Sequence, residues 1–321
     1  MRAVFFLWLS TICLLASSKD SESADLVFHG MCDASAAVAI DHEFFAAASD
    51  EDSRIRIYRR SAGGPPVDVV DLSRVLDVTG RFPETDLEGA ARVGDRIYWI
   101  TSHARNRDGK FRPNRYRFFA TRLTMQSGKL QAAIDGKADK NLIDDLETDP
   151  LLAGFHFRLA SQRAPRDRGG LNIEGLCATP EGHLLIGFRN PVPDKKALLV
   201  PLLNPGEVLQ GQKARFGNAI LLDLDGRGIR DIAYAAGKYW IVAGAYDGGS
   251  KERVYQWDGG RATPELIQKV KGFNPEAIVV FPDKHDILLL SDDGNRQIGG
   301  VDCKDVPNEM LRQFRAFWLE P

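Results

Sequence analysis

Apolar and polar residues follow one another along this chain in a pattern that recurs five times. Each copy opens with an acidic residue, continues with small and apolar residues, makes a turn, and ends with an apolar run and a polar loop. Two copies read DLEGAARVGDRIYWITSHARN from Asp86 and NIEGLCATPEGHLLIGFRN from Asn172. The acids that open the five copies are Asp33, Glu88, Glu174, Asp231 and Glu276. The recurrence of one sequence pattern along the chain predicts a repeat architecture.

The middle of each copy predicts a buried β-hairpin. The turns, such as VGDR and TPEGH, are rich in Gly, Asp and Pro, as hairpin connections require. The second arms, such as IYWIT and LLIGF, are nearly continuous apolar runs, which are typical of strands covered on both faces. Further strand-like segments follow the hairpins, among them RIRIYRR, RYRFFATRLT, ALLVPLL, RVYQWD, QIGGVDC and FRAFWLEP.

Four antiparallel strands per copy predict an all-β protein with the β-propeller fold. Five four-stranded blades can be counted, and the long interval between Glu88 and Glu174 has room for a sixth, degenerate blade. That interval also contains the helix-like DGKADKNLIDDLETDP and the basic FHFRLASQRAPRDRGG. We expect one short helical insertion at about residues 136–171, with the basic segment as a loop over one face. A pair of β-sandwiches is the alternative, but it would not repeat one hairpin five times.

The first 24 residues have the pattern of a secretory signal peptide. Arg2 precedes an apolar run at residues 3–16, which is followed by SSKDSESAD, and the run is short for a transmembrane helix. Cleavage would follow Ser18 or Ala24, and an uncleaved membrane anchor is the alternative. We therefore expect residues 25–321 to form a single β-propeller domain, periplasmic or secreted, with no stable membrane insertion after cleavage.

The amino-acid composition limits the classes of molecule that this protein is expected to bind. The 42 Lys and Arg residues nearly balance the 44 Asp and Glu residues, so no global field steers the protein to nucleic acid, and we expect no nucleic-acid partner. Beyond the leader, three cysteines remain, at Cys32, Cys177 and Cys303. Cys177 lies in an expected inner strand and is interpreted as a buried apolar residue. A Cys32–Cys303 disulfide between the chain ends is left open.

The position of the acids within the repeat predicts a site. In an antiparallel hairpin the first residue of one strand lies beside the last residue of the other. The repeated acid and the polar loop therefore lie at the same end, and five such ends would meet at one mouth of the central channel. Like charges raise one another's pKa, so these carboxylates need Arg, His, backbone N–H groups or a bound cation beside them. An alternative structural role is that each acid bonds to the backbone of the next blade.

The polar loops supply the remaining candidates. They differ chemically between copies, which suits binding better than a repeated structural bond. The loop residues expected at the mouth are Asp50, Asp52, His103, Arg105, Asn106, Arg189, Asn190, Asp247, Asp292 and Asp293. We expect His103 and Asp292 to be the candidate acid–base groups, and Arg105 and Arg189 to bind an anion in bidentate fashion.

At these residues the sequence resembles a bacterial family of exported proteins classed only as a domain of unknown function. The motifs that carry the resemblance are GMCDASAAVAIDHEFFAAASDEDSRIRIYRR, DLEGAARVGDRIYWITSHARN, RPNRYRFFAT, NIEGLCATPEGHLLIGFRNP and NPEAIVVFPD. They extend over nearly the whole chain after the leader. The resemblance implies a β-propeller and supplies no catalytic residue.

The Asp/Asn-x-Glu-Gly pattern is also similar to that of two groups of propeller enzymes, the esterase-like phytases and the gluconolactonase-type calcium lactonases. This likeness covers only short inner-strand motifs, and fold does not imply function. The likeness is compatible with a metal-dependent hydrolase.

Two functional hypotheses follow. The first is an exported binding protein whose channel mouth holds a small anionic ligand or a protein loop, through Arg105, Asn106, Arg189, Asn190, Asp247 and Asp293. The second is a hydrolase of esters or phosphoesters that uses Ca²⁺ or another divalent cation. Its metal ligands would come from Glu88, Glu174, Asp231 and Glu276. The variation between the loops favours the binding hypothesis, and the sequence leaves open whether the protein is an enzyme.

Overall fold

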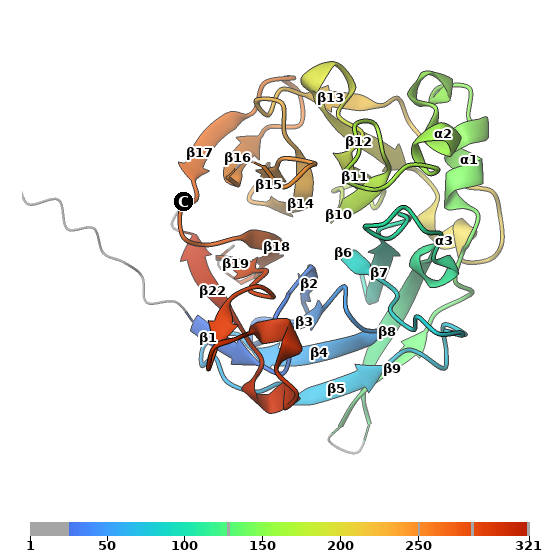
Figure 1. Cartoon of the computed structure of the whole chain (residues 1–321). Coiled ribbons are helices and arrows are strands. Elements are labelled where there is room, and N and C mark those ends of the chain that lie inside the picture. The colour runs from blue at the N-terminus through green and yellow to red at the C-terminus, as the bar shows by residue number, and fades with distance from the viewer. Residues whose placement is uncertain (1–25, 127–128, 250, 284–285, 320–321) are drawn as a thin grey trace, which may run out of the picture.

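The structure, a computed structural model, describes residues 26–126, 129–249, 251–283 and 286–319. Its strands form five four-stranded antiparallel sheets, arranged as blades around a central axis (Figure 1). The predicted β-propeller with five blades is therefore confirmed, and the described residues contain no sixth blade. The expected signal peptide lies outside the described residues. None of the helices in the described part of the chain has the length and apolar composition needed to span a bilayer.

The first four blades each follow the order of the chain from the inner to the outer strand. Blade 1 contains β2 (Ala36–Ala39), β3 (Phe44–Ala48), β4 (Arg54–Arg59) and β5 (Asp68–Asp71). Blade 2 contains β6 (Leu87–Val93), β7 (Arg96–Thr101), β8 (Phe118–Gln126) and β9 (Lys129–Ile134). Blade 3 contains β10 (Asn172–Ala178), β11 (Leu184–Asn190), β12 (Ala197–Leu202) and β13 (Ile220–Leu222). Blade 4 contains β14 (Gly228–Ala235), β15 (Lys238–Gly244), β16 (Arg253–Trp257) and β17 (Glu265–Lys269).

Blade 5 is built from both ends of the described chain and closes the ring. Its strands, from inside to outside, are β18 (Pro275–Val280), β19 (Ile287–Ser291), β22 (Gln313–Leu319) and β1 (Leu26–His29). The disulfide between Cys32 and Cys303, left open by the sequence, ties the same two ends together across 271 residues of sequence. The third cysteine, Cys177, is free and buried, as expected.

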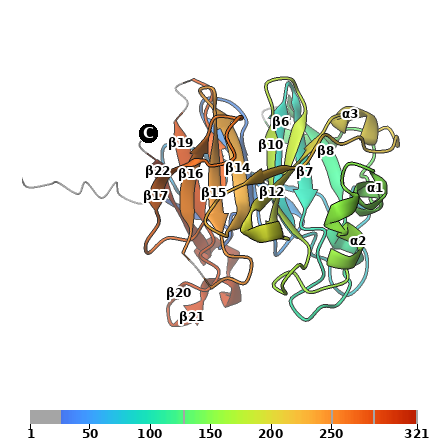
Figure 2. The same ribbon diagram turned by 90° about the horizontal axis from the view of Figure 1, so that it is seen from above.

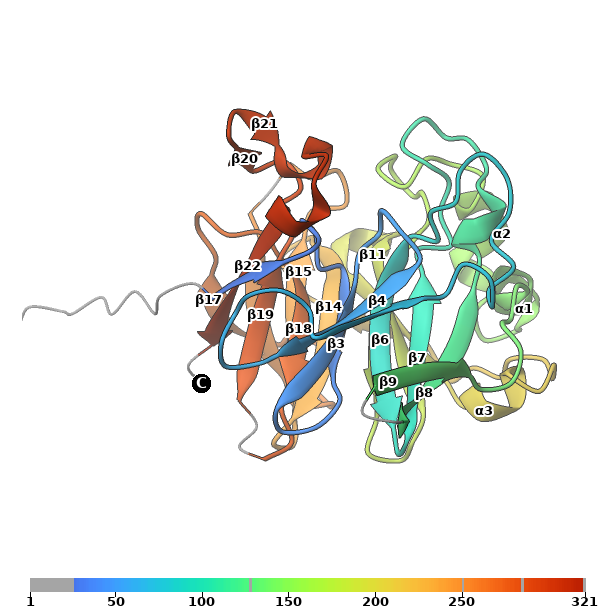
Figure 3. The same ribbon diagram turned by 90° about the horizontal axis from the view of Figure 1, so that it is seen from below.

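The predicted QIGGVDC strand does not join blade 5. It forms a separate hairpin of β20 (Gln297–Ile298) and β21 (Val301–Asp302), which projects from one end of the ring in Figures 2 and 3. The long teal loop between β7 and β8 projects from the same end (Figure 3). This end also carries the start of β6 and the end of β19, so it is the end at which the repeated acids are expected.

Helices are few and lie outside the blades (Figure 1). The expected insertion contains α1 (Leu142–Thr148) and α2 (Phe157–Ala160), whose buried side chains pack with those of blades 2 and 3. A third helix, α3 (Pro205–Val208), follows β12. Single 3-10 turns occur at Pro113–Arg115, Ala153–Phe155, Pro193–Lys195, Cys303–Asp305 and Glu309–Leu311.

The inner strands pack closely enough to need glycine after two of the repeated acids. A Cβ atom added at Gly89 would lie 2.9 Å from the Cβ of Leu176 in the next blade, and one added at Gly175 would lie 3.0 Å from Ile229 Cγ2. Real Cβ atoms do not approach this closely, so the backbones of neighbouring blades meet only because these residues lack a side chain. The Glu-Gly pair of the repeat thus places each acid where two inner strands touch.

Candidate functional site

In four of the five blades, a β-bulge interrupts the pairing of the two innermost strands, and it does so at the same end of each blade. The extra residue of the inner strand is Glu88 in blade 2, Glu174 in blade 3, Arg230 in blade 4 and Glu276 in blade 5. A bulge re-aims the side chain of its extra residue. These four residues therefore leave the alternation of the strand and meet at the mouth of the channel.

The mouth is a polar cavity of about 430 Å³. Eight carboxylates line it, namely Asp33, Asp50, Asp86, Glu88, Glu174, Glu252, Glu276 and Asp292. Five guanidinium groups face them, from Arg107, Arg115, Arg166, Arg189 and Arg230. Asn172, Asn274 and Asn295 also contribute to the lining. With all of these groups ionised, the acids outnumber the arginines, so the cavity has an excess of negative charge.

Two buried arginines neutralise the side of the mouth formed by blades 3 to 5. Arg189 Nη1 donates to Glu174 Oε1 at 2.7 Å, and Arg230 Nη2 forms an ion pair with Glu276 Oε1. Arg230 Nε also lies 3.5 Å from Glu174 Oε2. These side chains are all nearly inaccessible to solvent. The acids of this network are thus paired with arginines, although Glu174 Oε2, Glu276 Oε2 and Arg230 Nε form no hydrogen bond with the described residues.

The side formed by blades 1 and 2 lacks this compensation. Glu88 is only 7% exposed, yet its carboxylate has no hydrogen bond or ion pair with any described residue. Asp33 accepts one hydrogen bond, from Ser35 Oγ at 3.0 Å, and Asp86 pairs with Arg115 Nη1 at 2.9 Å. The mouth therefore has an arginine-rich half and a carboxylate-rich half, with Glu88 between them.

Burial dominates the electrostatics of the carboxylate-rich half. It raises the pKa of Glu88 well above its usual range, and the neighbouring carboxylates of Glu174 and Asp86 raise it further. Burial, followed by the charge of Asp86, raises the pKa of Asp50 to about 8. Burial and then Asp292 raise the pKa of Asp33 in the same direction. Each shift means that the folded protein disfavours the ionised carboxylate unless a cation accompanies it.

The carboxylate oxygens are close enough together for one cation to touch several of them. In three sets, each residue offers an oxygen within 4.8 Å of the others. The sets are Asp33 with Glu276 and Asp292, Asp50 with Asp86 and Glu88, and Glu88 with Glu174 and Glu276. Glu88 belongs to two sets, and all the donors are oxygens, which are the ligands that Ca²⁺ and Mg²⁺ prefer. Three of the four expected metal ligands, Glu88, Glu174 and Glu276, are therefore brought together.

The fourth expected ligand, Asp231, has a structural role. Its Oδ1 accepts from the backbone N–H of Ile232 at 2.8 Å, and its Oδ2 accepts from the N–H of Ile278 in the next blade at 2.7 Å. This bond to the next blade is the structural alternative proposed for all five acids, and it is realised here. The ungapped repeat is one residue out of register in blade 4, where the bulge gives the mouth position to Arg230.

His103 does not line the mouth. It is completely buried, and its Nδ1 lies 2.8 Å from the carbonyl oxygen of Thr101, so this nitrogen donates. Burial lowers its pKa to about 4, so the ring is neutral at pH 7. Asp292, the other candidate acid–base group, does line the mouth, where it accepts from Asn274 Nδ2 at 3.0 Å and from the N–H of Gly294 at 2.9 Å.

Among the predicted binding residues, Arg189 lines the mouth and Asn190 lies beside it. The others bond within their own loops or to neighbouring strands. Arg105 donates to the carbonyls of Ser161 and Gly109, Asn106 accepts from Lys110 N–H, and Asp247 accepts from Gly249 N–H. Asp293 pairs with Arg315, and Asp52 pairs with Arg54 and Arg56. Asp50 joins the mouth, as expected.

Four of the five arginines of the mouth, namely Arg107, Arg115, Arg166 and Arg230, escaped the analysis of the repeat. Arg107 follows the polar loop of blade 2, and Arg166 lies in the basic segment before β10. Neither side chain has a hydrogen bond or ion pair with the part of the chain that the structure describes. Burial and the positive charges of Arg189 and Arg107 lower the pKa of Arg166. The only sequence signal was the basic composition of the two loops, without a position within the repeat.

Residues 116–286, just over half of the chain, match the family described as Protein of unknown function (DUF3616). The chain belongs to this family, which confirms the resemblance to a domain of unknown function. A search of the curated proteins found no significant match.

Solved structures with similar folds include propeller enzymes, at low similarity. Glutaminyl cyclase from Myxococcus xanthus is 14% identical, with 92% of this chain and 94% of that chain covered and a TM-score of 0.47. The PQQ-bound aldose sugar dehydrogenase from Streptomyces coelicolor is 12% identical, with 93% and 98% covered and a TM-score of 0.48. Arabinanase Arb43A from Bacillus subtilis is 11% identical, with 93% and 96% covered and a TM-score of 0.44. No functional argument is drawn from similarity at this level.

Proposed function

We propose that the channel mouth of this family member binds a divalent cation, and that the cation and nearby arginines together bind a small anionic ligand. The observation that carries the proposal is Glu88. The residue is 7% exposed, its carboxylate has no hydrogen bond or ion pair with the described residues, and it belongs to two of the three oxygen clusters. A buried charge without a partner is costly, so a cation beside Glu88 would relieve the largest imbalance in the cavity.

The arginine network indicates on which side of Glu88 the cation binds. Glu174 and Glu276 already have Arg189 and Arg230 as partners, so arginines balance their charges, although Oε2 of each accepts no hydrogen bond from the described residues. Asp50 and Asp86 lie with Glu88 in a second cluster, in which the ion pair of Asp86 with Arg115 is the only one among the described residues. We therefore assign Glu88, Asp50 and Asp86 as the protein ligands. A hard cation such as Ca²⁺ would complete its coordination with water, backbone oxygens or a ligand.

The anionic ligand follows from Arg107 and Arg166. Both side chains line the cavity with their guanidinium groups unpaired among the described residues. Burial and then the positive charges of Arg189 and Arg107 lower the pKa of Arg166, so a carboxylate or phosphate there would stabilise the charged form. A cation and two such arginines in one cavity suit an anion that contacts both.

Hydrolysis of an ester or phosphoester is the second candidate function. The oxygen clusters, the unpaired arginines and Asp292 all line one cavity, which favours this candidate because a cation can polarise a substrate oxygen and activate water. His103 is absent from the lining, so Asp292 is the remaining candidate acid–base residue. Turnover of a bound ester by the cation-loaded protein, lost in Asp292→Asn, would separate an enzyme from a binding protein.

Export to the periplasm or the medium is part of the proposal. The Cys32–Cys303 disulfide supports it, because disulfides persist mainly in oxidising compartments. The composition of residues 1–24 supports it in the same direction.

The cation is tested by calorimetric titration of EDTA-treated, dialysed protein with CaCl₂. Wild type should bind about one Ca²⁺ per chain, and Glu88→Gln should weaken binding at least about tenfold, or about 1.4 kcal/mol. The matched control is Glu265→Gln, because Glu265 is exposed on the outer strand β17. Equal Ca²⁺ affinity in wild type and Glu88→Gln, or no binding by wild type, would overturn the proposal. Folding is not a confounder, since glutamine removes a buried like charge.

A further inference from the structure

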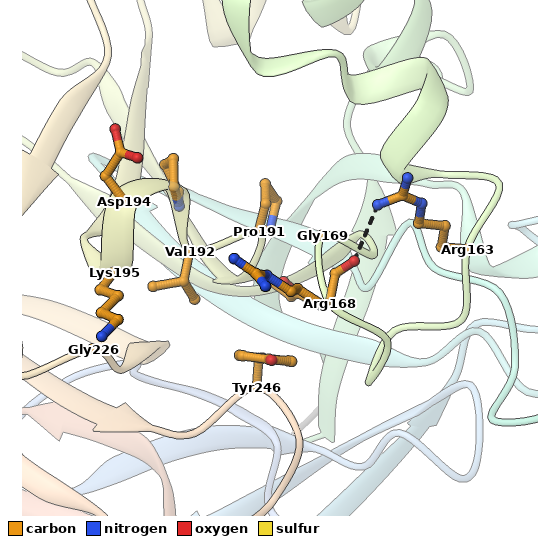
Figure 4. A pocket seen from close by; sticks show the side chains of 11 residues that line it. Arg163, Arg168, Gly169, Pro191, Val192, Asp194, Lys195, Gly226 and Tyr246 are labelled. Atoms are coloured by element: carbon orange, nitrogen blue, oxygen red, sulfur yellow. Dashed lines mark hydrogen bonds between the residues drawn. The ribbon is translucent and has the colours of Figure 1, made fainter.

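A second hollow, of about 900 Å³, lies beside the mouth and has a different chemistry (Figure 4). Apolar side chains, chiefly Tyr246 and Val192, form part of its lining. Arg163, Arg168 and Lys195 add positive charge, which exceeds the single negative charge of Asp194. In Figure 4 the ring of Tyr246 lies below Arg168 and Val192. We call this hollow the basic groove.

The basic groove is continuous in structure with the mouth. The loop before β10, the end of β11 and the loop after β15 each contribute residues to both hollows. At the end of β11, for example, Arg189 lines the mouth and the next residue, Asn190, lines the groove. The mouth and the groove are therefore neighbouring hollows built on the same three segments of the chain.

Three features of the groove call for particular groups on a ligand. The side chains of Arg168 and Lys195 have no hydrogen bond or ion pair with the described residues, so they are free for anions. Asn190 is 1% exposed and uses both hydrogens of its amide on the carbonyls of Pro165 and Asp167, at 2.8 and 2.7 Å. Its Oδ1 accepts no hydrogen bond from the described residues. A buried acceptor of this kind needs a donor, and the ring of Tyr246 offers an apolar surface.

We propose that the basic groove binds an acidic oligosaccharide, a chain of pyranose rings that carry carboxylates, whose end reaches the cation in the mouth. A pyranose ring has an apolar C–H face for Tyr246, hydroxyl donors for Asn190, and a carboxylate for Arg168 and Lys195. The cation and the arginines of the mouth would bind the terminal carboxylate. Binding of the terminal carboxylate in the mouth rests on the proposed function, whereas binding of the sugar chain in the groove does not.

Other anions fit the groove less well. Polyphosphate has no apolar face for Tyr246. An acidic peptide supplies its carboxylates and its apolar surface from different residues, whereas each sugar ring supplies both at one position. The neutral counterpart of the same sugar chain would leave the two cations without partners.

The test is calorimetric titration with mono-, di- and trigalacturonate, and with maltotriose as the neutral chain of matched length, in CaCl₂ and in EDTA. We expect trigalacturonate to bind at least about tenfold tighter than the monomer and than maltotriose. Tyr246→Ala and Lys195→Gln should each remove most of the gain with length and leave Ca²⁺ affinity unchanged. The matched controls are Tyr234→Ala, which faces the opposite end of the channel, and Lys269→Gln on the outer strand β17.

The outcomes separate the groove from the mouth. Trigalacturonate binding that equals maltotriose binding, or that Tyr246→Ala changes no more than Tyr234→Ala does, would overturn the inference. Tighter binding of hexaglutamate than of trigalacturonate would overturn the assignment to a saccharide. Tyr246-dependent binding of trigalacturonate that is identical in CaCl₂ and EDTA would support the groove and count against the cation. Ca²⁺ binding with no saccharide binding would support the mouth alone and overturn the groove.

Discussion

Asp50 gives the sharpest physical prediction, because burial and the carboxylate of Asp86 raise its pKa from 3.8 to about 8. Between these two values the folded, cation-free protein holds a proton that the unfolded chain has released. Linkage then requires the free energy of unfolding to fall as the pH rises through this window, and to be greatest below the unfolded pKa. The perturbation that isolates this effect is Asp50→Asn, because asparagine is uncharged at every pH.

The magnitude follows from the shift. One pKa unit corresponds to about 1.4 kcal/mol, so between pH 5 and pH 7 Asp50 alone would lower the free energy of unfolding by at most about 3 kcal/mol. Asp50 keeps some contact with solvent, so we expect about 1–2 kcal/mol. Wild type in EDTA should therefore be less stable than Asp50→Asn at pH 7 to 8 by about this amount, and equal to it near pH 4.

The assay is urea unfolding followed by tryptophan fluorescence in EDTA, without reductant, at pH 4, 5, 6, 7 and 8. The difference between wild type and Asp50→Asn is the quantity of interest, and it also includes the loss of the Asp50 charge that helps to raise the pKa of Glu88 and Asp33. Saturating CaCl₂ should reverse the order at pH 7, because the cation binds the ionised carboxylate. A difference that does not change with pH would refute the reasoning and show that Asp50 is ionised without cost.

Two further predictions concern the frame of the mouth. Arg189→Ala should lower the free energy of unfolding by about 2–4 kcal/mol in the same urea assay, because it leaves the buried Glu174 with Arg230 at 3.5 Å and the neutral donor Asn172 Nδ2 at 2.7 Å; a loss below about 1 kcal/mol would mean that the pair behaves like a surface ion pair. Cys303→Ser should lower it by about 3–5 kcal/mol, since the Cys32–Cys303 disulfide joins residues 271 apart at the point where the ring closes; equal urea midpoints for the variant and for wild type under non-reducing conditions would contradict this.

The sequence predicted the propeller because each inner hairpin is a local feature. The acid, the turn and the apolar second arm lie within about twenty residues of one another. Every residue of one such second arm, β11 (LLIGFRN), is buried, which explains why its apolar run is continuous. The outer strand of blade 5 could not be predicted in this way. It is β1, which pairs with β22 from the other end of the chain, and a repeat period contains no information about such a pairing.

The site was predictable to within the register of a strand. The repeat identified Glu88, Glu174 and Glu276 but took Asp231 for the equivalent residue in blade 4, where the bulge presents Arg230. Side chains alternate along a strand, so a register error of one residue assigns to the mouth a side chain that lies at the interface between blades. Arg107 and Arg166 come from loops without periodicity, so only the folded chain brings them to the cavity.

The most direct test of the account is the position of a cation in the mouth. Crystals grown with CaCl₂ and measured at long wavelength would give an anomalous difference map of bound calcium. We predict one strong peak within about 2.6 Å of an oxygen of Glu88, with Asp50 and Asp86 around it. A map without a peak in the mouth, or with Glu88 bonded to an arginine in its place, would contradict the central claim.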